Sequence, residues 1–177
     1  MRIFTKRAER YSALGPVSEE YYVSSLGVGT VLVAGDLPVE LGLPDGAAMA
    51  PPSCPSSRWT RLLERYFAGE RVTFDLDVDA YADAHGLTDF ERDVYRALAR
   101  VPYGTAVSYR ELAAAAGRPN AYRAAGSAMA RNLLPVILPC HRVVRNDGRL
   151  GRYGDDPAWK ERLLKLEGVP ILEGRLA

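Results

Sequence analysis

The sequence predicts two domains: an α/β N-terminal half and a mostly α-helical C-terminal half that contains a helix-turn-helix. Three observations lead to this fold class. Short β-branched and aromatic runs broken by glycine lie within residues 17–41. Further along, capping-box patterns that begin at Thr88 and at Ser108 open two helices. A hydrophobic fraction of 47% and a charged fraction of 25% are ordinary for a globular protein.

The N-terminal half mixes strands and helices. We expect strands at residues 21–23 and 30–33, and a surface loop over residues 43–57, which hold four prolines. Apolar residues at helical spacing predict a helix over 58–68. Polar and apolar residues alternate over 72–78, which predicts a half-buried strand.

A polar stretch then predicts a linker, in which His85 stands alone as a linker residue. We therefore place an N-terminal α/β domain at residues 1–80, the linker at 81–86 and the C-terminal domain at 87–177.

The helices of the C-terminal half are marked by residues at their ends. Thr88 and Ser108 are expected N-caps, and Gly117 is expected just past the end of the second helix. Asn120 is expected to cap a third helix over residues 121–131. Two short helices joined by a glycine-containing turn are typical of a helix-turn-helix, although αα-hairpins that do not bind DNA share this pattern.

The charge is unevenly distributed, although the net charge is only +1. Residues 1–85 carry 8 Lys and Arg against 12 Asp and Glu, whereas residues 86–177 carry 15 against 10. A basic half on a nearly neutral chain indicates a polyanionic partner, although a solvated arginine-rich surface would give the same counts. Small residues around Arg123 suit close approach of that helix to such a partner; a poorly packed helix is the alternative.

Two cysteines, Cys54 and Cys140, are too few for a disulfide framework, and we expect free thiols. Cys54 lies in the proline-rich loop with no His or acidic residue near it in sequence, so we interpret it as incidental. Cys140 is followed by His141 and Arg142, a base and a positive charge of the kind that activates a thiol. A buried thiol beside a surface histidine would show the same pattern.

An acidic residue at the end of the last helix is a second sign of a site. Asp156 and Pro157 are expected to start this helix, as N-cap and first position, and Glu167 lies in its last turn. An acid there opposes the helix dipole, which can mark a functional constraint; a solvated surface glutamate is the alternative.

No run of residues approaches the roughly 18 apolar residues of a membrane span. The N-terminal segment lacks the apolar core of a secretory signal. We therefore expect a cytoplasmic protein with no membrane partner.

Several motifs occur in order around Cys140, continuously over about residues 86–169 and more loosely over 58–78. They are Pro139-Cys140-His141-Arg142-Val143, preceded by Asn132 and Pro135 and followed by Tyr153 and Leu163-Leu164-Lys165-Leu166-Glu167-Gly168, with Pro102-Tyr103-Gly104-Thr105-Ala106-Val107-Ser108-Tyr109, Leu112-Ala113 and Arg123-Ala124-Ala125-Gly126 upstream. In these motifs the chain resembles the O6-alkylguanine-DNA alkyltransferase family.

The resemblance implies a fold and an activity. The N-terminal domain would be ribonuclease-H-like, and the C-terminal domain winged-helix-like with a helix-turn-helix. The activity would be direct reversal of DNA alkylation damage, in which the O6-alkyl group of guanine, and by extension the O4-alkyl group of thymine, moves to Cys140 after base flipping. The thioether product is stable, so each chain would act once, with no cofactor and no metal.

The resemblance also implies roles for individual residues. Cys140 matches the nucleophile, and His141, through a water, and Glu167 match the relay that takes the thiol proton. Asn132 matches the residue that holds the cysteine-bearing turn. Tyr109 matches the tyrosine that helps to rotate the nucleotide out and polarises guanine at N3.

The implied partner is double-stranded DNA carrying O6-alkylguanine, bound in the minor groove by a monomer, with cooperative binding left open. Arg123 matches the arginine finger that replaces the extruded nucleotide. The other expected DNA contacts are Tyr109, Ala121, Ala124, Ala125, Gly126 and Arg131. The expected base pocket consists of Met129, Pro135, Val143, Tyr153 and Gly154.

This chain departs from the family pattern in two places. Gly154-Asp155-Asp156 follows Tyr153 where glycines or a serine are usual, which removes a serine contact to O6 and adds negative charge. Leu133 replaces the usual proline. The alternative functions are a non-catalytic alkylated-DNA-binding protein of the alkyltransferase-like type, a cysteine hydrolase and a DNA-binding regulator.

Overall fold

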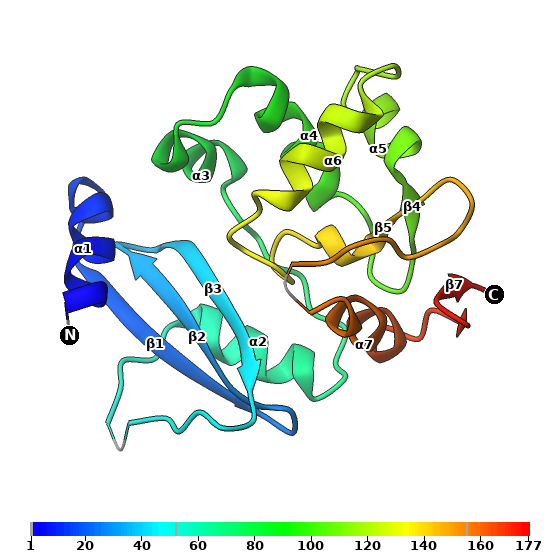
Figure 1. Ribbon diagram of the computed structural model, residues 1–177. Helices are drawn as coiled ribbons and strands as arrows, with labels where there is room; N and C mark the ends of the chain where they lie inside the picture. Colours follow the sequence, from blue (N-terminus) through cyan, green and yellow to red (C-terminus); the bar gives the residue numbers. More distant parts are fainter. Residues whose placement is uncertain (1, 52, 155) are drawn as a thin grey trace. The chain divides into compact units, whose positions relative to one another are not determined.

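The computed structural model describes residues 2–51, 53–154 and 156–177. The chain forms two compact units, Met1–Gly86 and Leu87–Ala177. Figure 1 shows a sheet with helices in the first unit and mainly helices in the second.

The first unit is built on a three-stranded antiparallel sheet in the order β1-β2-β3. The strands are β1 (Val17–Ser24), β2 (Gly27–Ala34) and β3 (Leu37–Asp45). Tyr22 of β1 lies opposite Gly29 of β2, and a Cβ at residue 29 would sit 2.1 Å from the tyrosine ring. Glycine is therefore required at this position, so that the ring can cross the neighbouring strand.

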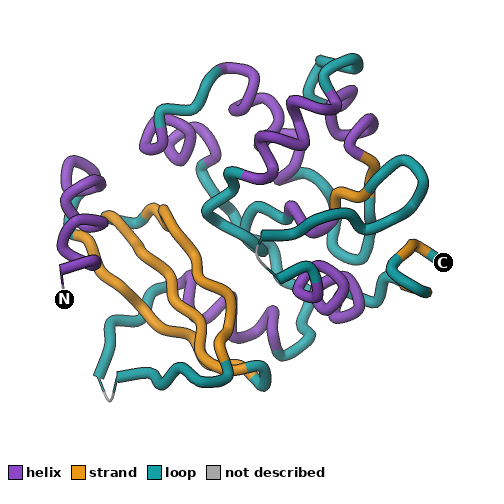
Figure 2. Tube along the Cα trace, viewed as in Figure 1, coloured by secondary structure: helices purple, strands orange, loops and turns teal. Residues whose placement is uncertain are grey.

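Helices α1 (Arg2–Tyr11) and α2 (Arg58–Phe67) lie in the same unit as the sheet (Figure 2). The side chain of Ser57 accepts a hydrogen bond from the Trp59 amide and caps α2 at its N-terminus. The Trp59 indole donates to the carbonyl of Asp36 at 2.9 Å, which ties this helix to the turn between β2 and β3. Tyr11 ends α1 and packs in a core cluster with residues of β2 and β3.

Three predictions for the first unit were wrong. Residues 72–77 carry no regular secondary structure, so the predicted strand over 72–78 does not form. The predicted linker at 81–86 is instead mostly helix α3 (Val78–His85), which the side chain of Asp77 caps. The expected surface loop also starts late, because β3 continues to Asp45.

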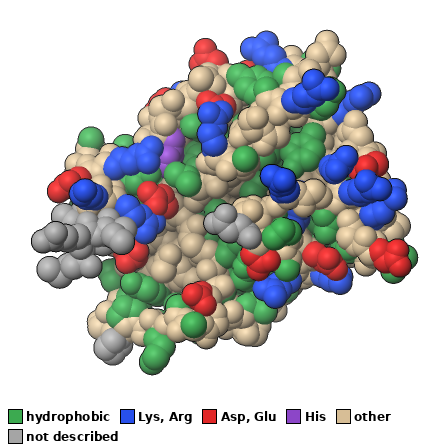
Figure 3. Space-filling view, viewed as in Figure 1, with side chains coloured by type: hydrophobic (Ala, Val, Ile, Leu, Met, Phe, Trp, Pro, Cys, Tyr) green, Lys and Arg blue, Asp and Glu red, His purple; other side chains and the backbone are tan. Residues whose placement is uncertain are grey.

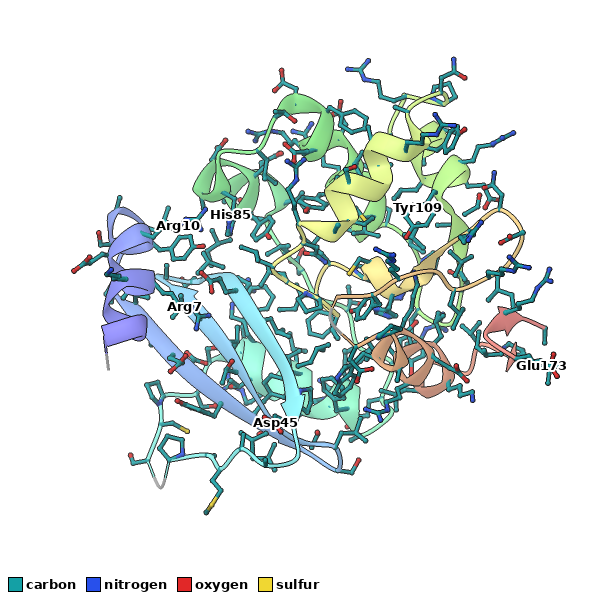
Figure 4. All side chains as sticks on the ribbon, viewed as in Figure 1. Arg7, Arg10, Asp45, His85, Tyr109 and Glu173 are labelled. Atoms are coloured by element: carbon teal, nitrogen blue, oxygen red, sulfur yellow. The ribbon has the colours of Figure 1, made fainter. Side chains whose placement is uncertain are left out.

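His85 is therefore a residue of packed structure and not of a linker. Its Nε2 atom lies 3.0 Å from the carbonyl oxygen of Val39, and its ring packs on Tyr81 and Tyr11 (Figure 4). Gly86 adopts a positive φ of 59° and ends the helix at the boundary between the two units.

The second unit begins with helix α4 (Asp89–Ala99), where the predicted capping box forms between Thr88 and Glu91. The hydroxyl of Tyr95 donates to the Ala128 carbonyl at 2.8 Å and joins this helix to α6 (Tyr122–Ala130). The contact is buried, so it fixes the helix of the predicted helix-turn-helix that carries Arg123.

Helix α5 (Tyr109–Ala115) precedes α6, and the two helices pack on each other at the place of the predicted helix-turn-helix. The second capping box, between Ser108 and Glu111, is present, and Gly117 adopts φ 74° after the helix end, as predicted. Asn120 is not the cap of α6, because Ala121 occupies the N-cap position and no side chain caps the helix.

A short parallel strand pair brings the helix-turn-helix next to the predicted cysteine site. Strand β4 (Val107–Ser108) leads directly into α5, and strand β5 (Val143–Val144) directly follows the Cys140–Arg142 turn. Val107 pairs with Val143 and Ser108 with Val144. Two segments about 35 residues apart in sequence are therefore held in one register.

The unit ends with helix α7 (Ala158–Leu166) and a small hairpin of β6 (Ile171–Leu172) and β7 (Arg175–Leu176). Helix α7 starts one residue later than predicted: Pro157 is the N-cap, while Asp156 accepts a hydrogen bond from the Ala158 amide. In the part of the chain that the structure describes, no helix is long and apolar enough to cross a membrane.

Candidate active site

Cys140 begins a single turn of 3-10 helix, Cys140–Arg142, and is buried. The turn follows a constrained segment, in which the fully buried Val136 has a positive φ of 76°. A β-branched residue pays a steric cost for this conformation, which persists only where the surroundings enforce it. The backbone that leads to the thiol is thus held in a strained but defined path.

Asn132 connects the start of this segment, at Leu134, with its end, at Cys140. Its Nδ2 atom lies 3.1 Å from Sγ of Cys140 and 2.8 Å from the carbonyl oxygen of Leu138, and donates to both. Its Oδ1 atom accepts a hydrogen bond from the amide of Leu134 at 3.0 Å. One side chain therefore fixes both the position of the sulfur and the loop before it.

Glu167 lies at the centre of a buried ionic cluster. Its Oε1 atom is 2.6 Å from Nε2 of His141, and both side chains have no exposed surface. The guanidinium of Arg142 donates to both carboxylate oxygens, each at 2.9 Å, and also to the carbonyl of Val101. The amide of Gly104 donates to Oε2 at 3.1 Å.

This burial decides between two interpretations of the sequence. Glu167 is the C-cap of α7, one residue beyond its last turn, and is not a solvated surface residue. Nor is His141 a surface histidine, since it is fully buried. The unfavourable position at the helix end is offset by the paired guanidinium of Arg142.

The hydrogen-bond partners set the charge states of the cluster. Burial by itself raises the pKa of Glu167, but the hydrogen bonds from His141 and Arg142 outweigh it and hold this pKa at about 2. Burial lowers the pKa of His141, only partly opposed by its bond to Glu167. At neutral pH we therefore expect an ionised glutamate and a neutral imidazole, with the hydrogen on Nε2 facing Glu167 and Nδ1 as the basic nitrogen.

Cys140 itself is protonated at rest. Burial raises the pKa of its thiol, while the hydrogen bond from Asn132, the hydroxyl of Tyr153 and the positive charge of Lys160 act in the opposite direction. The groups that would stabilise a thiolate are thus already in place around a thiol. Such a site makes an anion only when a base takes the proton.

Lys160 was missed at the level of the sequence. It lies on α7, is 1% exposed, and burial lowers its pKa to about 8. Its Nζ atom is 5.8 Å from the ring centroid of Tyr109. A signal was available: Lys160 precedes Leu163, Leu164 and Glu167 by three, four and seven residues, the spacing of one buried helix face.

The residues that we predicted to contact DNA differ in how far they are exposed to solvent. Arg123 and Ala124 on α6 are exposed, and Ala121 and Gly126 are half-buried. Ala125 has no exposed surface, so its predicted contact with DNA was wrong; its methyl group belongs to the core of the unit.

Two further predicted contacts are held by protein neighbours. Arg131 is exposed and forms an ion pair with the buried Glu91. Tyr109, labelled in Figure 4, is half-buried at the start of α5, and its ring lies 3.8 Å from the position of a Cβ on Gly126. Gly126 thus lets α6 lie close to the tyrosine.

Basic side chains are spread over the face of the molecule seen in Figure 3. In the loop before α7, Arg145 and Arg149 are exposed and flank Asp147 at 3.7 and 3.8 Å. Arg175 of β7 donates to the Asp147 carbonyl. A single acid therefore neutralises only part of this arginine group.

The predicted pocket residues are also in the second unit. Met129 and Val143 are buried, Pro135 and Tyr153 are half-buried, and Gly154 is exposed. Of these, Tyr153 interacts with the thiol, because its hydroxyl lowers the pKa of Cys140. Asp155, part of the departure from the family pattern, lies outside the described residues.

Comparison with known proteins identifies the family. Residues 89–169 match the family model described as the DNA-binding domain of 6-O-methylguanine DNA methyltransferase. The crystal structure of Mycobacterium tuberculosis O6-methylguanine methyltransferase is 32% identical, with a TM-score of 0.65, and the match covers 86% of this chain and 93% of that one. The chain belongs to the methylated-DNA–protein-cysteine methyltransferase family.

Other members of the family are similar. The Methanosarcina barkeri methylated-DNA–protein-cysteine methyltransferase is 46% identical over 107 residues, which is 60% of this chain and 65% of that protein. The chain thus spans about two thirds of the length of this curated relative. A structure of Mycobacterium tuberculosis OGT in complex with DNA is 32% identical with a TM-score of 0.66, over 84% of this chain and 91% of that one. The mixed α/β architecture of this chain is that of the family's solved structures.

Proposed function

We propose that this protein repairs alkylated DNA by transferring the O6-alkyl group of guanine irreversibly to the sulfur of Cys140. The observation that carries the proposal is the position of Cys140. It is held by Asn132, next in sequence to a buried histidine that is paired with an ionised glutamate. A thiol with a nearby base, oriented by a carboxylate, is the arrangement of an activated cysteine nucleophile.

The transfer is a displacement at the alkyl carbon. The thiol proton passes through a water to Nδ1 of His141, and the charge of Glu167 stabilises the imidazolium that forms. The sulfur then forms its bond to the alkyl carbon as the bond from that carbon to O6 breaks. Guanine leaves as an anion that a hydrogen bond from Tyr109 to N3 stabilises, and it takes up a proton from solvent at N1. His141 returns its proton to solvent, so in the net reaction the alkyl group moves to sulfur and guanine gains one hydrogen.

The product limits each chain to one reaction. A thioether has no leaving group that water displaces under mild conditions, so the alkyl group stays on Cys140. The same thiol that makes the protein reactive therefore ends its activity. A non-catalytic alkylated-DNA-binding protein would not need Cys140, nor the hydrogen bonds that hold it.

The proposed substrate is a guanine flipped out of duplex DNA, because O6 of a stacked base is out of reach. We propose that α6 enters the minor groove and that Arg123, exposed in the first turn of this helix, takes the place of the extruded nucleotide. The matched DNA-binding model and the DNA complex of the related M. tuberculosis protein support DNA as the partner. Ala121, Ala124 and Gly126 are the small residues that we expect to face the groove.

We further propose that Met129, Pro135, Val143, Tyr153 and Gly154 form the pocket for the flipped base. The reaction would take place in the second unit, which we propose to be a winged-helix-like DNA-binding and alkyl-transfer domain. We propose that the first unit is a ribonuclease-H-like domain. We propose that the protein acts as a cytoplasmic monomer and that O4-alkylthymine is its second substrate.

The test follows the damaged base. A duplex containing a single O6-methylguanine is incubated with increasing amounts of protein, digested to nucleosides and separated by chromatography. We expect guanine to replace O6-methylguanine up to one equivalent per chain and then to stop. Repair that continues beyond one equivalent, or no repair at all, would contradict the proposal.

A further inference from the structure

A buried lysine without a fixed counter-ion lies in the region of the thiol. Lys160 is 1% exposed and shares its face of α7 with Leu163 and Leu164. Among the described residues, no carboxylate forms an ion pair with its ammonium group. By contrast, Lys165 on the same helix is exposed and pairs with Glu161, its Nζ 2.6 Å from the carboxylate. Burying an unpaired ammonium is costly, so its retention requires a reason.

The nearby carboxylate is already satisfied. Glu167 accepts hydrogen bonds from Arg142, His141 and the Gly104 amide. Lys160 therefore does not serve as the counter-ion of the glutamate. The positive charge of Lys160 instead acts against a proton on His141, since it lowers the pKa of the imidazole.

Helix α7, which carries Lys160, packs against the Cys140–Arg142 turn, and the group that interacts electrostatically with Lys160 is the cysteine. The lysine charge lowers the pKa of Cys140, and an anionic sulfur in turn raises the pKa of Lys160. The ring of Tyr109, 5.8 Å from Nζ, lies beside the cation. The other titratable groups of the site are the phenol of Tyr153, which also lowers the pKa of the thiol, and the His141, Arg142 and Glu167 cluster.

We propose that Lys160 supplies the positive charge that stabilises the Cys140 thiolate while the proton is removed. This inference rests on the proposed alkyl transfer and adds a residue to it. Lys160 is a positioning residue: it acts through the charge of the sulfur and exchanges no proton or alkyl group with the substrate. The lysine lacks a permanent partner because its partner is the thiolate, which exists only in the reactive state.

The role has a consequence for the used protein. Alkylation of Cys140 converts the sulfur to a neutral thioether, and Lys160 then has no anion to stabilise its charge. In the pH range where the free thiol ionises, the ammonium should therefore keep its proton in the free chain more readily than in the alkylated chain. This change is specific to an electrostatic role, because a lysine retained only for packing would not respond to it.

The test measures the thiolate directly, without DNA. In a Cys54→Ser background, Cys140 is the only thiol, and its ionisation is followed by ultraviolet absorbance as the pH is raised. We expect Lys160→Met to move the titration of Cys140 upward by about one unit and to slow methyl transfer at neutral pH about tenfold, a loss that higher pH recovers. Lys160→Arg should restore most of the Cys140 titration and of the rate of methyl transfer. Lys165→Met should match the parent in both measurements.

An unchanged Cys140 titration in a folded Lys160→Met variant would overturn the proposal. If that variant does not fold, the parent chain decides the question. The side-chain nitrogen signal of Lys160 is titrated by NMR before and after methylation of Cys140, and an unshifted titration would equally overturn the proposal. Failure of alkyl transfer itself is distinguishable, because the parent chain would then acquire no methyl group while its thiol still titrated.

Discussion

Nε2 of His141 lies 2.6 Å from Oε1 of Glu167, and neither side chain has any exposed surface. In this environment a charge on one partner is felt strongly by the other, because no water screens it. Burial lowers the pKa of His141, and the charge of Arg142, which also pairs with the carboxylate, acts in the same direction. The histidine therefore remains neutral and available as a base. The site thus holds the imidazole of His141 as a buried, neutral base, and the thiol stays protonated until the substrate binds.

Replacement of Glu167 by glutamine should slow the chemistry more than it weakens binding. An amide cannot stabilise the imidazolium that forms on His141, so we expect methyl transfer to fall about a hundredfold, within the range for general acid–base catalysis. Single-turnover rates at saturating protein measure this directly. DNA affinity, measured by fluorescence anisotropy on undamaged duplex, should remain within about twofold. An unchanged transfer rate would remove Glu167 from the proton relay.

Glu167 should also make the free energy of unfolding depend on pH in the acidic range. Its pKa is about 2 in the folded protein against an ordinary value of 4.5. A lowered pKa contributes stability that is fully present above pH 4.5 and is lost as the pH falls from 4.5 towards 2. Urea unfolding between pH 6 and pH 3 should show this loss, and a Glu167→Gln chain should show a smaller one. Equal slopes in the two chains would contradict the assignment.

Asn132 should contribute to both stability and rate. Replacement by alanine leaves the Leu134 amide without its acceptor, leaves the Leu138 carbonyl with only the Cys140 amide as donor, and frees the sulfur. We therefore expect a loss of about 1–3 kcal/mol in the free energy of unfolding. Methyl transfer should slow as well, because the sulfur is no longer held in place. The control is Asn146→Ala, at an exposed position in the loop after the site. If denaturant unfolding gave the two variants the same free energy of unfolding, Asn132 would not hold this loop.

Arg123 should matter for duplex DNA and not for the chemistry. Without its side chain the extruded nucleotide is not replaced, so repair of a duplex should slow about tenfold or more. Reaction with the free alkylated base needs no flipping and should be nearly intact. Arg61→Ala removes one exposed charge from the first unit and serves as the control for net charge. Equal losses on both substrates would refute the finger role.

Local signals in the sequence were sufficient for much of the second unit. Thr88 and Ser108 form their capping boxes because the required side chains lie three residues apart, a pattern that needs no distant partner. The same applies to Gly117, whose positive φ follows from its place after a helix. The proximity of Cys140, His141 and Glu167 was available only through the family resemblance, because 26 residues separate the last two.

Elsewhere tertiary context decided the structure. Residues 72–78 alternate like a strand, but no strand among the described residues pairs with this segment, and Asp77 instead caps a helix. The polar stretch after it folds as α3 because Tyr81 and Ala82 find a buried surface. Ala125 shows a different error. A small residue on α6 suits close approach to DNA, but the side chain of Ala125 is buried in the core of the second unit.

The central claim is that Cys140 itself accepts the alkyl group, once. The most direct measurement is the intact mass of the protein after incubation with excess duplex containing O6-methylguanine, followed by mapping of the modified peptide. We predict the addition of one methyl group per chain, located on Cys140, and no addition in Cys140→Ser under the same conditions. An unmodified parent chain, or a methyl group that persists when Cys140 is replaced, would contradict the account.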